Sequence, residues 1–155
     1  MLLKYIKMTV QPFSVIGISV RTTNENGQSS ADIPALWQRF MLENIAEQIP
    51  GKYSPDIYCL YTDYEKDHTK PYTTILGCRV NSLDTIPDGL TGITVAGGDY
   101  KPFAASGNIF KGAVFETWVK IWNSGLSRAY STDFEVYGEK ATDPENAVVD
   151  IFVAV

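Results

Sequence analysis

The predicted elements of this chain occur in the same order twice, and this repeat restricts the fold more than any other feature of the sequence. Each copy consists of a strand, a helix and two further strands, and the copies are offset by roughly 75 to 80 residues. Residues 58–61 (YCLY) match residues 134–137 (FEVY), and the segments that carry Trp37 and Trp118 match each other. A duplicated domain is therefore the leading prediction, because two copies of one unit can cover the face that each leaves open.

In the first copy, residues 4–22 contain many apolar residues with strand character and are predicted to be extended. Apolar residues at helical spacing predict a helix over residues 33–49, which a Pro-Gly pair ends. Two strands follow, over residues 56–64 and 72–80. The polar stretch 65–71 between them predicts a hairpin.

The second copy repeats this plan. Residues 90–103 are predicted to be extended, residues 110–122 to be helical, and residues 133–137 and 147–155 to be strands. Residues 81–89 are rich in turn-forming residues and form the predicted link between the copies.

These elements predict an α+β fold of duplicated β-α-β-β units with pseudo-two-fold symmetry. Antiparallel sheets would carry two helices on one side and a ligand groove on the other. We expect residues 1–155 to form a single domain, with repeat one over about residues 1–80 and repeat two over about residues 90–155.

The charge balance restricts the class of partner. The chain has 13 Lys and Arg residues against 18 Asp and Glu residues, a formal net charge of −5. This balance favours a neutral or cationic partner and argues against direct binding of nucleic acid, which depends on neutralised phosphates. Neither a signal peptide nor a run of about 18 apolar residues is present. We therefore expect a cytoplasmic protein without a membrane partner.

Residue types that hold metals and cofactors are sparse. Cys59 and Cys78 lie in apolar, strand-like runs without a CxxC motif, and they are expected to be buried, reduced thiols. His68, the single histidine, lies in a polar turn and is expected to be solvated. Gly97-Gly98 lacks the sequence context of a phosphate-binding loop. We therefore expect no metal, nucleotide or redox cofactor.

Strand alternation in the second copy selects the candidate ligand contacts. Phe134 and Val136 share one face of their strand and are expected to pack on the helices. Glu135 and Tyr137 share the other face and would line the groove. Tyr61 corresponds to Tyr137 in the first copy, so it is expected to face the groove from the opposite half.

Several other candidates have two interpretations. Asp150 is a single carboxylate in an apolar strand, and it either supplies a second acid to the groove or pairs with a Lys or Arg. Trp37 and Trp118 either belong to the core or reach into the groove, whereas Trp122 is expected in the core. Three further tyrosines either line the groove or are ordinary strand residues: Tyr58, Tyr64 and Tyr72.

Four segments carry a family resemblance. The helix VFETWVKIWNSGL and the strand segment AYSTDFEVYGEK (residues 129–140) resemble the GyrI-like effector-binding domains, and so do YCLYTDYEKD and YTTILGCRV in the first copy. That family includes the ligand-sensing domains of AraC-type and MerR-type multidrug regulators, and also free-standing members carried on integron cassettes. The resemblance covers essentially the whole chain.

The resemblance implies a binding function. Members of the family bind lipophilic cations with aromatic walls and a buried glutamate. By position, Glu135 matches that glutamate and Tyr137 matches a second pocket-facing residue. Some single-domain relatives are implied to be hydrolases that use a Glu with a Tyr.

The expected function is therefore binding of small lipophilic cationic or aromatic compounds in a groove between the repeats, without a DNA-binding domain. The candidate ligand-binding residues are Glu135, Tyr137, Tyr61, Asp150, Trp37 and Trp118. Two alternatives stay open: a small-molecule hydrolase with Glu135 as general base, and a protein-interaction module of the gyrase-inhibitor type. A protein partner or a homodimer is compatible with each of them.

Overall fold

The computed structural model describes residues 6–155, so Lys4 and Tyr5 of the first predicted extended segment lie outside the described residues. Within these residues, eight strands form one antiparallel sheet. The strands are β1 (Met8–Val10), β2 (Phe13–Thr22), β3 (Ile57–Thr62), β4 (Tyr72–Val80), β5 (Thr91–Val95), β6 (Gly98–Gly107), β7 (Thr132–Tyr137) and β8 (Ala147–Ala154). The helices are α1 (Ser29–Leu42), α2 (Ile45–Gln48) and α3 (Ala113–Trp122), with short 3₁₀ turns η1 (Glu25–Gly27), η2 (Ile109–Lys111), η3 (Glu139–Ala141) and η4 (Pro144–Asn146).

The order of the strands confirms the predicted pseudo-two-fold symmetry. Across the sheet the order is β1-β6-β8-β7-β3-β4-β2-β5. Strands β7 and β3 form the centre, followed outward by β8 and β6 in one half and by β4 and β2 in the other. The β3–β7 register places Cys59 opposite Glu135, and these residues occupy equivalent positions in the repeated segments 58–61 and 134–137. The pseudo-two-fold axis therefore passes between Cys59 and Glu135.

Two strand predictions had different outcomes. The predicted hairpin is confirmed, because β3 and β4 pair antiparallel, with Tyr58 opposite Gly77. The single extended segment predicted over residues 90–103 is instead divided into β5, which pairs with β2, and β6, which pairs with β8. Gly97 lies at the division with a φ of 82°, and a Cβ there would lie 2.4 Å from the Val10 carbonyl oxygen. Only glycine fits this close crossing without strain.

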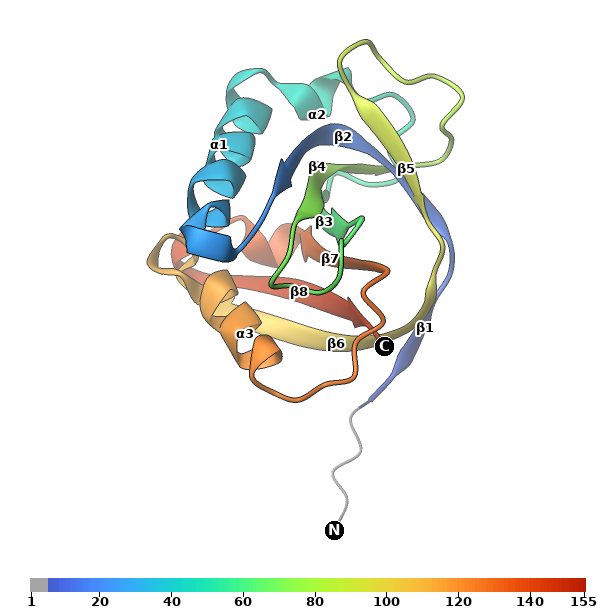
Figure 1. Cartoon of the computed structure of the whole chain (residues 1–155). Helices are drawn as coiled ribbons and strands as arrows, with labels where there is room; N and C mark the ends of the chain where they lie inside the picture. The colour runs from blue at the N-terminus through green and yellow to red at the C-terminus, as the bar shows by residue number, and fades with distance from the viewer. Residues whose placement is uncertain (1–5) are drawn as a thin grey trace.

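The helices cover one face of the sheet, one over each half. Figure 1 shows α1 and α3 on the same side, with the outer strands curling away from them. From α1, Leu36 and Phe40 pack against buried side chains of β2 and β4, and from α3, Trp118 and Ile121 pack over β6 and β8. Each fully buried side chain of this size contributes about 1.5–3 kcal/mol.

The helix boundaries differ from the prediction at the turns. Helix α1 begins at Ser29 and ends at Leu42, because Asn44 adopts a left-handed φ of 51° and separates the short α2. In the second half, Gly112 with a φ of 91° separates η2 from α3.

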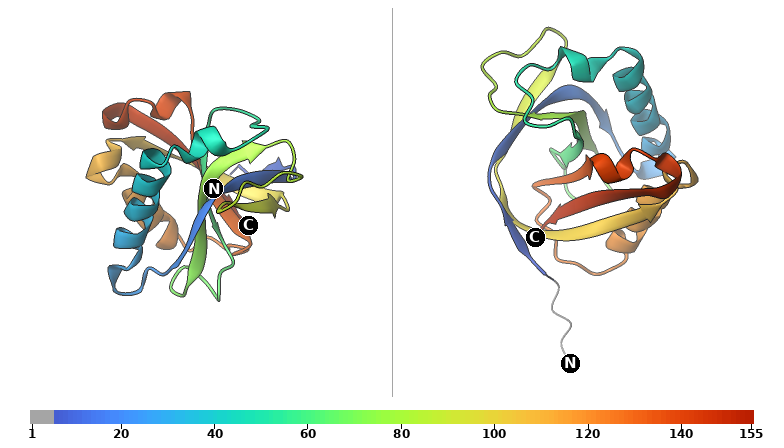
Figure 2. Two further views of the ribbon diagram at one scale, coloured as in Figure 1. Left: turned by 90° about the horizontal axis from the view of Figure 1, so that it is seen from above. Right: turned by 180° about the vertical axis from the view of Figure 1, so that it is seen from behind.

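The opposite face of the sheet is also buried, because the sheet curls on itself (Figure 2). The curl encloses an aromatic core in which Phe134 lies 5.1 Å from Phe13 and 5.3 Å from Tyr100, measured between ring centroids. Val136 packs against the same cluster. The prediction that Phe134 and Val136 pack on the helices is therefore wrong, because a second apolar core lies within the curl of the sheet.

Candidate functional site

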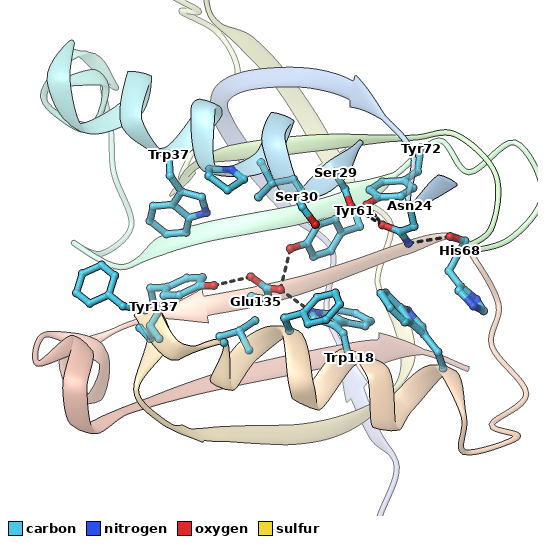
Figure 3. A pocket seen from close by; sticks show the side chains of 18 of the residues that line it. Asn24, Ser29, Ser30, Trp37, Tyr61, His68, Tyr72, Trp118, Glu135 and Tyr137 are labelled. Atoms are coloured by element: carbon cyan, nitrogen blue, oxygen red, sulfur yellow. Dashed lines mark hydrogen bonds between the residues drawn. The ribbon is translucent and has the colours of Figure 1, made fainter. Parts of the chain in front are cut away.

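A cavity of about 650 Å³ lies between the two helices and the central strands. Its lining includes Trp37 from α1, Trp118 from α3, Tyr61 from β3, and Glu135 and Tyr137 from β7. Figure 3 shows these side chains converging from the helices and from the strands beneath them. We call this cavity the inner pocket.

The inner pocket lies on the helix side of the sheet, so the predicted groove on the opposite side is wrong. The two helices cover their own halves and leave the central pair β3–β7 between them open (Figure 3). The far face is filled by the aromatic core within the curl. Alternation correctly grouped Glu135 with Tyr137, but both residues face the helices.

Glu135 forms the centre of the site. Its side chain is 1% exposed. Oε1 accepts a hydrogen bond from the Tyr137 hydroxyl at 2.7 Å. Oε2 accepts one from the Tyr61 hydroxyl at 2.8 Å and one from Nε1 of Trp118 at 2.6 Å. Four of the predicted residues, from α3 and both central strands, therefore belong to one hydrogen-bond network.

Burial and hydrogen bonding act in opposite directions on the carboxyl group. Burial raises the pKa of Glu135, whereas the bonds from Tyr137, Trp118 and Tyr61 lower it, and the net direction is upward. Burial also raises the pKa of Tyr61 and Tyr137 well above the ordinary value, so both phenols remain donors. Within residues 6–155, no cationic side chain forms an ion pair with Glu135. The pocket therefore contains a carboxylate stabilised by neutral donors alone.

Aromatic rings form the walls around this carboxylate. Trp37 packs edge-on against Tyr137, with 4.7 Å between ring centroids. Tyr61 contacts Trp118 at 5.4 Å and Tyr72 at 5.9 Å. The core and groove interpretations of the two tryptophans both apply, because each packs against a hydrophobic cluster and also lines the inner pocket.

Two candidates lie elsewhere. Asp150 is exposed on β8, and it alternates with Val149 and Ile151, which are fully buried in the cluster that contains Trp118 of α3. It therefore points away from the pocket, and its predicted place in the groove is wrong. Tyr58 lies in the aromatic core on the same far side, 5.6 Å from Phe13 between ring centroids.

Some pocket residues differ from the prediction. His68 was predicted to be solvated, but its ring stacks on Trp122 with 5.2 Å between centroids, and both residues line the inner pocket. Tyr64 and Tyr72 also line it, which resolves their two interpretations. No local pattern could have placed His68, because the β3–β4 turn reaches α3 only through the tertiary fold.

A buried ion pair next to the pocket was also missed. Nη2 of Arg128 lies 2.6 Å from Oδ2 of Asp133, and these side chains are 3% and 0% exposed. Tyr64 donates to the same oxygen at 2.6 Å, and the Ala154 amide donates to Oδ1 at 2.8 Å. Asp133 neutralises Arg128, so the unbalanced buried charge at the pocket is that of Glu135.

Two classes of site receive no support from the described part of the chain. Among residues 6–155, no three His, Cys, Asp or Glu side chains are grouped so that they could hold a metal ion. In the same range, no helix has the length and apolar character needed to cross a bilayer. Cys59 and Cys78 are both buried and free, as predicted.

Comparison with known proteins gives a consistent family. Residues 8–155 match the sequence model of Cass2, integron-associated effector binding protein. YobU of Bacillus subtilis (strain 168), named for a proposed role in transcriptional regulation, is 29% identical over 143 residues, which cover 90% of this chain and 89% of YobU.

Solved structures agree with that match. An integron cassette protein of Vibrio cholerae is 31% identical with a TM-score of 0.72, over 97% of this chain and 94% of that chain. The protein SAV2435, solved with bound tetraphenylphosphonium, has a TM-score of 0.78 at 19% identity, over 97% of this chain and 93% of that chain. At that identity, the likeness to SAV2435 shows a shared fold only.

Proposed function

The chain belongs to the Cass2 family of integron-associated effector binding proteins, and we propose that its effectors are small lipophilic cations with aromatic groups. The observation that carries this proposal is the Glu135 carboxylate, which is buried and surrounded by neutral donors within an aromatic pocket. The tetraphenylphosphonium bound to SAV2435, which shares the fold, supports the same ligand class.

The physical argument begins with charge. A cation that enters the pocket meets a carboxylate without a counter-ion, in surroundings where attraction is stronger than in water. Bulky, delocalised cations lose little hydration on entry, and faces of Trp37, Trp118 and the tyrosines add cation–π attraction of about 0.5–2 kcal/mol each. The inner pocket of about 650 Å³ is within the size range of drug-sized ligand sites.

The same geometry disfavours the hydrolase alternative. A general base must take a proton from water, whereas both oxygens of Glu135 already accept hydrogen bonds from protein donors. These bonds lower the pKa of Glu135 and so favour its negatively charged form. That arrangement suits recognition of a cation better than proton transfer.

The test is a binding titration with three compounds of similar shape: tetraphenylphosphonium, tetraphenylborate and triphenylphosphine oxide. We expect the cation to bind far more tightly than the anion or the neutral compound, and Glu135→Gln to remove most of that preference. Glu116→Gln, an exposed change on α3, serves as the control for charge. Equal affinity for the cation and the anion, or a preference that survives Glu135→Gln, would contradict the proposal. Product formation detected by mass spectrometry would favour the hydrolase.

A further inference from the structure

A second groove of about 1190 Å³, which we call the outer groove, lies beside the inner pocket. The two spaces meet at Trp37 and Tyr137, whose edge-on rings lie between them. Six residues line both spaces: Ile33, Pro34, Trp37, Ile109, Phe110 and Tyr137. The shared lining places the two spaces side by side, so a ligand that reached past this aromatic pair would enter the outer groove.

The outer groove differs from the inner pocket in charge. The carboxylates of Asp56 and Glu139 line it, and within residues 6–155 its lining contains no Lys, Arg or His. Neither carboxylate takes part in an ion pair with another described residue. The other lining residues are mostly apolar, and they include Met41 and Pro144. The groove is therefore complementary to a cationic group carried on an apolar linker.

The strand register gives the spacing between the two acidic regions. Ile57 pairs with Tyr137, so Asp56 lies beside Gly138, and Oδ1 of Asp56 lies 3.2 Å from the point that a Cβ of Gly138 would occupy. Gly138 lies three positions after Glu135, directly beyond the last residue of β7. At about 3.3 Å per residue, the backbone at Glu135 and the backbone beside Asp56 are about 10 Å apart, which sets the scale of the spacing between the two acidic regions.

We propose that the preferred ligands are elongated bis-cations. One cationic group binds at Glu135, the linker passes Trp37 and Tyr137, and the second cationic group lies beside Asp56 and Glu139 about 10 Å away. This inference rests on the proposed function, because the first cation must bind in the inner pocket. The exposed ring of Phe110 at the junction offers further contact to the linker.

The experiment compares octamethylene-bis(quinolinium) with octylquinolinium, which has the same chain and one charge. We expect the bis-cation to bind about fivefold more tightly at low ionic strength, the gain of a favourable exposed ion pair, and less at high salt. The double variant Asp56→Asn/Glu139→Gln should lose this gain and keep the affinity for octylquinolinium. The control variant Asp88→Asn/Glu116→Gln removes the same charge from exposed sites outside both spaces and should keep the gain.

The outcomes separate this inference from the proposed function. If octylquinolinium binds and the second charge adds nothing, or adds as much in the Asp56→Asn/Glu139→Gln variant, the inference is overturned and the proposed function stands. If neither compound binds, both are overturned. Ethylene-bis(quinolinium), in which the charges are too close together, should bind no better than octylquinolinium, and a full gain from it would also count against the outer groove.

Discussion

Removal of the Tyr61 hydroxyl tests whether Glu135 is charged in the folded protein. Tyr61→Phe deletes the donor that lies 2.8 Å from Oε2 and leaves the ring contacts with Trp118 and Tyr72 in place. A hydrogen bond to a charged group contributes about 1.5–3 kcal/mol, against about 0.5–1.5 kcal/mol for a bond between neutral groups. We therefore expect the larger loss of stability while Glu135 is ionised and the smaller loss once it is protonated.

The sign follows from the pKa. The Tyr61 bond lowers the pKa of Glu135, so its removal raises that pKa further, and the free-energy cost is greatest at pH values above the pKa in both proteins. Urea unfolding of wild type and Tyr61→Phe from pH 8 to about pH 4 measures the difference, and an unchanged m-value shows that the unfolding transition is the same.

Tyr100→Phe is the matched control. Its hydroxyl is also buried but donates to a neutral acceptor, the Thr132 carbonyl oxygen at 2.7 Å. We expect a loss of about 1 kcal/mol that does not depend on pH. If Tyr61→Phe gives the same pH-independent loss, then Glu135 is uncharged over the whole range, and a fixed negative charge cannot be the basis of cation binding.

The remaining predictions concern charge and spectroscopy. Burial raises the pKa of Glu135 above its ordinary value of 4.5. Affinity for tetraphenylphosphonium should therefore fall as the pH is lowered through this raised pKa. Calorimetric titrations should show the fall for wild type and His68→Asn but not for Glu135→Gln. Asp133→Asn leaves the Arg128 charge buried and unpaired, so it should lower the free energy of unfolding in urea by about 3–5 kcal/mol. The exposed Asp150→Asn should change it by less than about 0.5 kcal/mol. Similar losses from the two variants would contradict the structural role of the ion pair. The three tryptophans of the chain all line the inner pocket: Trp37, Trp118 and Trp122. An aromatic cation should therefore change the tryptophan fluorescence, and an unchanged spectrum at saturation would place the ligand outside the inner pocket.

The sequence contained the grouping of the site residues but not the side of the sheet on which they lie. Alternation places Glu135 and Tyr137 on one face, and the repeat adds Tyr61. Which layer covers a face depends on tertiary structure, and here both faces are buried. Phe134 therefore looked like a helix contact although it packs within the curl of the sheet.

Contacts between distant segments account for the other differences. His68 reaches Trp122 because the β3–β4 turn folds over α3, and Asp133 meets Arg128 across the left-handed turn at Tyr130, whose φ is 54°. Neither segment has a periodic pattern from which such a contact could be predicted. The prediction that Asp150 lies in the groove is wrong for a different reason: a single acid in an apolar strand is as compatible with an exposed position as with a buried one.

The pseudo-two-fold axis explains why the site has a single carboxylate. Glu135 lies opposite its own repeat equivalent, Cys59, so an unchanged duplication would place two glutamates side by side on the axis. Two carboxylates at that distance would repel, and one would remain protonated. Cys59 removes this conflict, because burial raises the pKa of its thiol well above the ordinary value and keeps it neutral. The symmetric halves thus provide two aromatic walls, and the difference between positions 59 and 135 leaves one negative charge between them.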